Sequence, residues 1–292
     1  MLAGIFPPLP TPFNSDESFS PSLQKSLIEK LLPDVDGFLI LGSNGEAVYL
    51  DEEERVVVLE NARKIIPKNK IMIAGTGGEA TRTVIKRTQE AAKIGADYAL
   101  VVAPHYFKGL MNEEVLYKHY ISVADNSPIP VLLYNVPAAT TIALSPKLIG
   151  RLAKHENIVG IKDSSGNIIA LTEIMRLTPK DFVVISGNAS SFLAAIAMGA
   201  KGGILAVANI APTQYKSIIT LTQAGKLQEA QELQTSLNPL ALCVTSKYGV
   251  PGLKAALGLL DNSAGVCRKP LLMPDEKVVD EIRQTIQVLK YF

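Results

Sequence analysis

Short runs of aliphatic and β-branched residues recur along the chain, separated by longer stretches in which apolar residues return with helical spacing. The runs are continuously apolar, which is typical of strands buried on both faces of a parallel sheet. They lie at residues 37–41, 71–74, 98–103, 129–136, 158–161, 182–186 and 203–207. With an opening strand near residues 3–6, they give eight strand and helix units before about residue 225, the number that closes an α/β barrel.

The stretches between these runs carry recognisable helix ends. Asp51 precedes an amphipathic stretch, and Glu54 stands where a capping box needs it. Ser145 is followed by a proline and predicts a second helix start. Gly95 and Gly199 end two similar segments in which a helix leads directly into a strand.

This order of elements predicts a (β/α)8 TIM barrel over residues 1–225, followed by a C-terminal helical appendage over residues 226–292. A doubly wound open sheet has the same alternation and is the alternative architecture. It is disfavoured because no Gly-x-Gly-x-x-Gly fingerprint follows the first strand, and Gly75, Gly77 and Gly78 follow the third strand with a different spacing.

Composition and charge exclude several classes of partner. Of the 292 residues, 47% are hydrophobic and 20% are charged, and the formal net charge of +1 would not attract nucleic acid or a membrane surface. The apolar stretch 190–212 is interrupted by Lys201 and by glycines, which disfavours a membrane span. Cys243 and Cys267 form no Cys-x-x-Cys pair, and residues 1–13 lack a basic region and are broken by prolines. We therefore expect no disulfide framework, no zinc site and a cytoplasmic protein.

Polar side chains follow several of the apolar runs, at the barrel end where active sites of this fold lie. The ones of interest are Ser43, Asn44, Tyr134 and Lys162. Because side chains alternate along a strand, Gly160 and Lys162 should face the barrel interior while Val159 and Ile161 face the helices. The same alternation points Tyr134 inward, so its phenol and the Lys162 amine are predicted to meet across neighbouring strands.

These side chains predict an imine-forming site. The neutral amine of a lysine attacks the carbonyl of a 2-oxo acid, and the imine then accepts electrons when a carbon–carbon bond breaks. A phenol beside a serine, as Tyr134 beside Ser43, can relay the proton of the hydroxyl group, and the turn 42–46 offers donors for the carboxylate. The alternative for each residue is structural: a surface ion pair of Lys162 with Asp163, a packed ring at Tyr134, and a helix cap at the turn.

The chain resembles the dihydrodipicolinate synthase and N-acetylneuraminate lyase family of class I aldolases from residue 4 to nearly its end. The resemblance rests on the motifs Gly-Ser-Asn-Gly-Glu (42–46), Ala-Pro-His-Tyr (103–106), Tyr-Asn-Val-Pro (134–137), Gly-Ile-Lys-Asp-Ser-Ser-Gly (160–166) and Ser-Gly-Asn (186–188). It implies a lyase without metal or other cofactor that acts on a small 2-oxo acid through a Schiff base at Lys162. It further implies Tyr134 as the proton relay and Ser43 as its link to Tyr106 of a neighbouring subunit.

The resemblance also implies a substrate-binding set and an assembly. The binding set comprises Ser43, Asn44, Ser164 and Gly187. The assembly implied is a homotetramer built as a dimer of dimers.

Departures from the family's patterns narrow the range of expected substrates. Ala139 stands where the lysine-pathway synthases have an arginine, and Ala189 and Ser190 stand where the sialate lyases have acidic residues. The sequence is most similar to 4-hydroxy-2-oxoglutarate aldolases, notably over 127–134 and 248–254, which implies cleavage of 4-hydroxy-2-oxoglutarate to pyruvate and glyoxylate. Aldolases of 2-keto-3-deoxy sugar acids, and then 4-hydroxy-tetrahydrodipicolinate synthase, are the alternatives.

Other function classes stay open at this point. A metal-dependent enzyme is disfavoured because His105, His119 and His155 are scattered along the chain without a carboxylate cluster. A phosphate-binding barrel is suggested by the glycines before the eighth strand, although a helix-to-strand turn explains them more simply. A non-catalytic barrel used for binding is the third alternative, because Ala139 lacks the charge that would hold a substrate.

Overall fold

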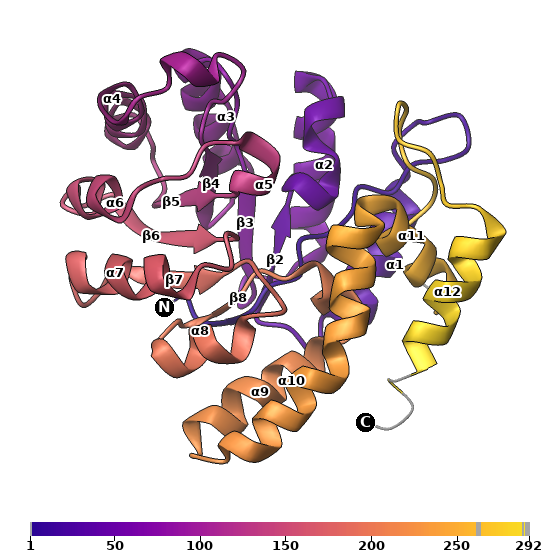
Figure 1. The fold of residues 1–292 in the computed structure, drawn as a ribbon. Coiled ribbons are helices and arrows are strands. Elements are labelled where there is room, and N and C mark those ends of the chain that lie inside the picture. Colours follow the sequence, from indigo (N-terminus) through magenta and orange to yellow (C-terminus); the bar gives the residue numbers. More distant parts are fainter. Residues whose placement is uncertain (1, 261–263, 288, 290–292) are drawn as a thin grey trace.

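The computed structural model describes residues 2–260, 264–287 and 289, and its core is an eight-stranded parallel sheet rolled into a barrel (Figure 1). The strands follow one another around the barrel in the order β1-β8-β7-β6-β5-β4-β3-β2. They are Gly4–Ile5 (β1), Gly37–Ile40 (β2), Ile71–Gly75 (β3), Tyr98–Val102 (β4), Val131–Asn135 (β5), Ile158–Asp163 (β6), Val183–Ser186 (β7) and Gly202–Gly203 (β8). The predicted TIM barrel is confirmed.

The barrel closes between β2 and the segment that follows β1. Pro8 forms an isolated parallel bridge with Leu39. The N–H of Leu39 donates to the carbonyl of Pro7 at 3.1 Å, and the N–H of Leu9 donates to the carbonyl of Leu39 at 2.9 Å. Because proline has no N–H, this seam has fewer ladder hydrogen bonds than a seam between two ordinary strands.

Helices surround the strands, and in Figure 1 the orange and yellow helices near the C-terminus lie along one side, close to the first helix. The helices that belong to the barrel are Pro21–Leu31 (α1), Glu52–Ile65 (α2), Thr81–Ile94 (α3), Glu113–Asp125 (α4), Pro137–Thr140 (α5), Pro146–Leu152 (α6), Ile168–Leu177 (α7), Phe192–Met198 (α8) and Pro212–Gln223 (α9). They are followed by Leu227–Leu242 (α10), a π-helical turn Cys243–Lys247, Gly249–Leu259 (α11) and Glu276–Ile286 (α12). Among the described residues, no helix is long and apolar enough to cross a membrane. The division of the chain at residue 225 stays a prediction.

The predicted helix ends are confirmed. Asp51 and Glu54 form a complete capping box, in which the Asp51 carboxylate accepts from the Glu54 N–H at 2.8 Å and the Glu54 carboxylate accepts from the Asp51 N–H at 3.2 Å. The Ser145 hydroxyl accepts from the Leu148 N–H at 3.1 Å. Gly95 and Gly199 end their helices with φ of 97° and 114°, a conformation that side-chain-bearing residues rarely adopt.

Two apolar layers hold the barrel together. Side chains from successive strands fill its interior, and a larger layer lies between the strands and the helices. The inner layer consists of Leu2, Phe6, Leu39, Ile73, Leu100, Leu132, Tyr134, Ile185 and Ile204. Ile161 lies in the outer layer as predicted, but the prediction for Val159 was wrong, because Val159 packs against the inner layer. The reason is a register shift between Val131 and Leu132 that leaves one extra residue on β6 and resets the alternation.

The last strand is shorter than its apolar run predicts. The run 203–207 was expected to be a strand, but β8 covers only Gly202–Gly203, and Ala206–Asn209 forms a short 3-10 helix. The side-chain amide of Asn209 donates to the carbonyls of Pro8 and Ala206 at 3.0 and 2.9 Å, which holds this turn against the closing seam.

Candidate active site

Lys162 and Tyr134 lie opposite each other at the carboxyl ends of β6 and β5. They are register partners in the parallel ladder, and the Lys162 Nζ atom lies 4.2 Å from the centre of the Tyr134 ring. Both side chains are buried, with exposed fractions of 3% and 6%. The adjacency predicted from strand alternation is therefore confirmed.

The Tyr134 hydroxyl is the polar centre of this cluster. It lies 3.5 Å from the Ser43 hydroxyl, where either group can donate. Burial alone would raise the pKa of the Tyr134 phenol, but the nearby charge of Lys162 and hydrogen bonds with Ser43, Lys162 and Ser164 outweigh it and hold the pKa below its usual value. A phenol with a lowered pKa gives up its proton more readily than an ordinary tyrosine, and its phenolate can take one back in a later step.

Gly187, at the end of β7, leaves room for these side chains. A Cβ atom at this position would lie 1.9 Å from the Ser164 hydroxyl oxygen and 2.9 Å from Cε of Lys162. The Gly187 N–H donates to the Asp163 carbonyl at 2.7 Å, so the backbone is held in this place. Only glycine fits here without displacing Ser164 or Lys162, which accounts for its place in the Ser-Gly-Asn motif.

Asp163 is turned away from Lys162. One carboxylate oxygen accepts from the side-chain amide of Asn135 at 2.6 Å, and the other accepts from the Ser165 hydroxyl at 2.7 Å. The side-chain amide oxygen of Asn135 in turn accepts from the Leu144 N–H at 3.0 Å. This buried network fixes the segment that contains α5, and it makes the alternative of a surface ion pair between Lys162 and Asp163 wrong. The sequence analysis did not identify it, because the bonds through Asn135 join residues that are 28 and 9 positions apart.

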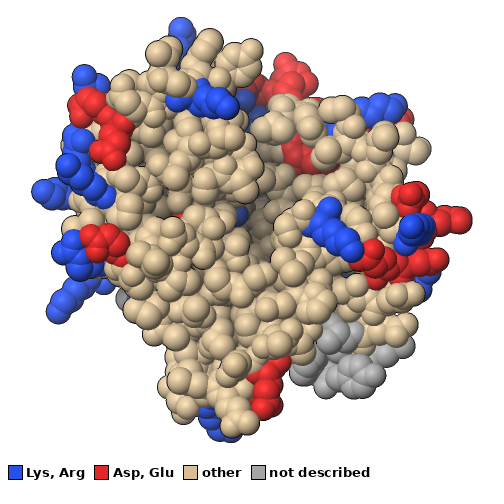
Figure 2. Space-filling view, viewed as in Figure 1, with Lys and Arg blue, Asp and Glu red and all other residues tan. Residues whose placement is uncertain are grey.

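A cavity of about 520 Å³ opens beside Tyr134. Its lining combines the turn after β2, the ends of β3 to β5, and α5. Among the lining residues are Ser43, Arg55, Arg87, Tyr134, Ala139 and Thr140. The face seen in Figure 2 is hollowed near its centre, and charged residues lie mostly toward the periphery of that view. The cavity is therefore walled mainly by uncharged groups next to a buried amine and phenol.

Two of the predicted site residues lie at the edge of this cluster or outside it. Asn44 is half-buried in the short 3-10 helix Ser43–Gly45. Tyr106 is 77% exposed, stacks edge to face with Phe107 at 5.0 Å between ring centres, and has its N–H bound to the Glu79 carboxylate at 2.8 Å. The structure thus gathers Ser43, Tyr134, Ser164, Lys162 and Gly187 in one place, and it directs Tyr106 to the surface.

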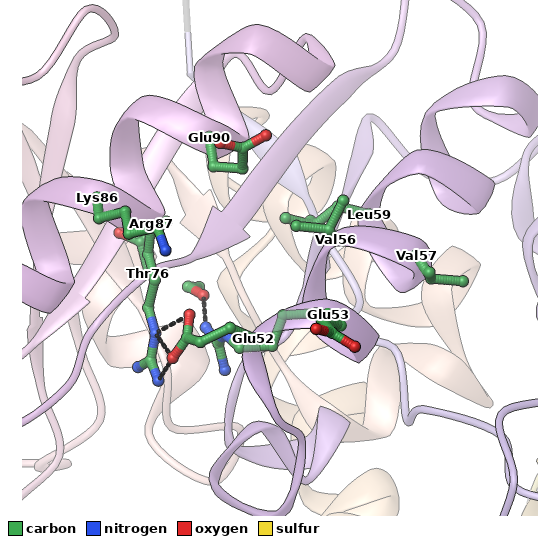
Figure 3. Close-up of a pocket in the computed structure, with 11 residues that line it drawn as sticks. Glu52, Glu53, Val56, Val57, Leu59, Thr76, Lys86, Arg87 and Glu90 are labelled. Carbon is green, nitrogen blue, oxygen red and sulfur yellow. Dashed lines mark hydrogen bonds and ion pairs between the residues drawn. The ribbon is translucent and has the colours of Figure 1, made fainter.

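A second cavity, of about 410 Å³, lies on the outer side of the barrel between α2 and α3 (Figure 3). Arg87 forms an ion pair with Glu52 at 2.5 Å, and this hydrogen bonding lowers the pKa of the Glu52 carboxyl. Arg55 donates to the Gly75 carbonyl at 2.7 Å, and burial lowers its pKa to about 10. The described lining of this cavity contains none of the predicted catalytic residues.

Among the residues that the structure describes, no group of three or more histidine, cysteine, aspartate or glutamate side chains is arranged to hold a metal ion. Cys243 and Cys267 are buried free thiols. Besides the lysine, tyrosine and serine side chains, the cavity lining contains Glu79 and His105, whose carboxylate and Nδ1 atom lie 3.1 Å apart.

Comparison with known proteins covers nearly the whole chain. A family model described as the dihydrodipicolinate synthetase family matches residues 1–289. The 4-hydroxy-tetrahydrodipicolinate synthase of Archaeoglobus fulgidus is 35% identical over 291 residues, which is 99% of both chains. The enzyme of the same name from Methanoculleus marisnigri is 36% identical over 290 residues, which is 98% of this chain and 99% of the relative.

Solved structures of proteins with the same family name have a similar fold. A dihydrodipicolinate synthase from Bacillus anthracis superposes with a TM-score of 0.94 at 30% identity, covering 98% of this chain and 97% of that one. The chloride-inhibited dihydrodipicolinate synthase from Acinetobacter baumannii, solved in complex with pyruvate, superposes with a TM-score of 0.94 at 29% identity over the full length of both chains.

Proposed function

The chain belongs to the dihydrodipicolinate synthetase family, and from this premise we propose that Lys162 is the lysine that forms a Schiff base with pyruvate. Members of the family are class I, pyruvate-dependent aldolases, so the enzyme is a lyase. The observation that carries the proposal is the pairing of Lys162 with Tyr134 at a Nζ-to-ring distance of 4.2 Å in the barrel mouth.

The proposed reaction begins when the Lys162 amine attacks C2 of pyruvate and water leaves, which forms the imine. Loss of a proton from C3 gives an enamine, whose carbon attacks the carbonyl of an aldehyde, and the aldehyde oxygen takes up a proton. Tyr134, with Ser43 at 3.5 Å from its hydroxyl, relays these protons. Water then releases the product from Lys162, and the same steps in reverse give cleavage.

Binding of the pyruvate carboxylate is proposed for Ser43 and Asn44, with Ser164 and Gly187 completing the site. Ser43 lines the cavity and contacts Tyr134, and the missing side chain of Gly187 leaves room for Ser164 and Lys162. A carboxylate held there would be within reach of hydroxyl and amide donors, which favour it without adding a full charge.

For the aldehyde partner, the names of the curated relatives support condensation of pyruvate with aspartate semialdehyde, the reaction of a 4-hydroxy-tetrahydrodipicolinate synthase. Cleavage of 4-hydroxy-2-oxoglutarate is the second candidate. It is favoured by Ala139, which lines the cavity at the position where the synthase pattern has an arginine. Aldolases of 2-keto-3-deoxy sugar acids are the third candidate.

Reduction with borohydride in the presence of pyruvate, followed by peptide mass mapping, tests the Schiff base. We expect a pyruvyl adduct on Lys162, which lies beside Tyr134, and none on Lys254, which is equally buried but is paired with Glu46. An adduct on another lysine, or no adduct, would refute the proposal. Steady-state rates with each aldehyde substrate then rank the candidates, and Ala139→Arg should shift the preference toward aspartate semialdehyde.

We further propose that the active form is a homotetramer in which Tyr106 completes the site of a neighbouring copy, in the cytoplasm. The proposal is supported by the exposure of Tyr106 and its neighbour Phe107, at 77% and 65%. Mixing Lys162→Ala and Tyr106→Phe chains, each of low activity alone, should restore activity, because some sites then combine an intact lysine with an intact tyrosine. No recovery in mixed oligomers would overturn the role of Tyr106.

A further inference from the structure

Glu46 closes the turn that carries Ser43, and it does so in an unusual conformation. Its φ of 52° lies in the left-handed region that residues with side chains seldom adopt. The whole residue is 2% exposed, and the lining of the cavity beside Tyr134 does not include it. A buried carboxylate at a strained position needs specific partners to stay there.

The partner of Glu46 comes from the far end of the chain. Nζ of Lys254, on α11, lies 2.6 Å from the Glu46 carboxylate, and the two side chains are 0% and 1% exposed. The same Nζ atom donates to the carbonyls of Thr11 and Val266 at 2.8 and 2.5 Å. It also lies 4.6 Å from the centre of the Phe13 ring. The ammonium group is therefore fully surrounded by acceptors and by one aromatic face.

Further bonds join the same turn to the same region. The Thr11 hydroxyl donates to the Gly45 carbonyl at 2.6 Å. The Arg268 N–H donates to the second oxygen of the Glu46 carboxylate at 2.9 Å. The turn that presents Ser43 is thus bonded to three other segments, which are the segment after β1, α11 and the segment that precedes α12.

We propose that the buried Glu46–Lys254 ion pair fixes Ser43 against the Tyr134 hydroxyl, and that Glu46 and Lys254 are positioning residues for the proton relay. This inference rests on the proposed function of Lys162 and Tyr134. Neither residue of the pair lines the cavity, so the pair acts through the turn, whose Ser43 and Glu46 are joined by an N–H to carbonyl bond of 3.1 Å. Loss of the pair should therefore leave the Lys162 amine able to form an imine but weaken the two functions proposed for Ser43, which are proton transfer through Tyr134 and binding of the pyruvate carboxylate.

The choice of variant matters, because removal of one partner leaves the other charge buried and unpaired, which strongly destabilises a fold. The double variant Glu46→Gln/Lys254→Met removes both charges while keeping similar volumes. Lys247→Met is the matched control, because Lys247 also lies in the C-terminal helical region and pairs with Glu281, but its side chain is 52% exposed.

The test measures folding, trapping and proton transfer separately. We expect the double variant to show the far-UV circular dichroism of the wild type and to be trapped on Lys162 by pyruvate and borohydride. We expect its kcat, and its rate of exchange of the pyruvate C3 protons with D₂O, to fall by on the order of 10²-fold, as a displacement of about 1 Å at a reacting group does. The KM for pyruvate should rise, because Ser43 is also proposed to bind the pyruvate carboxylate, so trapping is compared at saturating pyruvate. Lys247→Met should keep the wild-type rates.

Two results would overturn the inference. One is a double variant with wild-type kcat and exchange rate. The other is a parallel loss of trapping and turnover, which would reveal a purely structural role for the pair. Failure of the wild-type protein itself to be trapped would instead refute the proposed function, so the two failures are distinguishable.

Discussion

Substitution of Gly187 by alanine places a methyl group inside the proposed Schiff-base site. The new Cβ would lie 1.9 Å from the Ser164 hydroxyl oxygen and 2.9 Å from Cε of Lys162. The first distance is about 1 Å shorter than such atoms tolerate, so Ser164 must rotate and Lys162 must move by several tenths of an ångström. The φ of Gly187 is not positive, so the backbone itself accepts alanine.

A displacement of about 1 Å within an active site, which is what the Ser164 hydroxyl must undergo, costs about 10²-fold in rate, and this corresponds to about 2.7 kcal/mol of transition-state stabilisation. We therefore expect Gly187→Ala to fold normally, to lose about 10²-fold in kcat/KM, and to be trapped slowly by pyruvate and borohydride. The measurements are steady-state kinetics, the rate of adduct formation followed by mass spectrometry, and thermal unfolding.

Two further variants serve as a control and as a compensating change. Gly258→Ala on α11 adds a methyl group where no atom lies within 4 Å, so it should leave the kinetics unchanged and stabilise the helix by up to about 1 kcal/mol. Gly187→Ala combined with Ser164→Gly removes the closest clash and should recover part of the trapping rate. Wild-type kinetics in Gly187→Ala would show that Lys162 does not react in this place, and the reasoning would be refuted.

The other predictions concern the proton relay, the buried histidine and the network behind Lys162. Tyr134→Phe should still be trapped on Lys162 but lose about 10²- to 10⁴-fold in kcat, and unchanged turnover would contradict the relay. Burial lowers the pKa of His119 from 6.5 to about 4, so its neutral form stabilises the fold above pH 6.5. That stability is lost as the pH falls toward 4, by about 3 kcal/mol, and urea unfolding of His119→Gln should lack this loss. Asp163→Asn presents an amide to the Asn135 and Ser165 donors and should lower the unfolding free energy by about 1–3 kcal/mol, measured by denaturant titration. An unchanged unfolding midpoint would show that the Asp163 network contributes nothing.

Local signals in the sequence predicted much of the fold. Asp51 with Glu54, and Gly95 and Gly199, each mark a helix end through backbone hydrogen bonds made within a few residues, so the sequence pattern is sufficient. Alternation along β5 and β6 likewise placed Tyr134 beside Lys162. It failed at Val159, because a register shift depends on how two strands pair and leaves no mark on either strand alone.

Contacts between distant segments were beyond the reach of such patterns. Glu46 belonged to a motif that the sequence analysis singled out for its donors, yet its carboxylate is buried against Lys254 rather than exposed at the site. Asp163 likewise looked like the ion-pair partner of its neighbour Lys162. In both cases the partner is chosen by the packing of the whole barrel, which a local reading of the sequence does not contain.

The partners of Glu46 lie near the end of the chain, and this affects when a newly synthesised chain becomes active. Arg268, which binds the Glu46 carboxylate, follows it by 222 residues. A ribosome that has released β8 has supplied every strand of the barrel together with Lys162, Tyr134 and Ser43, but it has not yet delivered α11 or the segment after it. At typical translation rates of roughly 5–20 residues per second, several seconds separate the two events. During that interval the nascent barrel has the Lys162 amine but lacks the groups that hold Ser43 in place, so we expect full activity only after synthesis reaches the last helices.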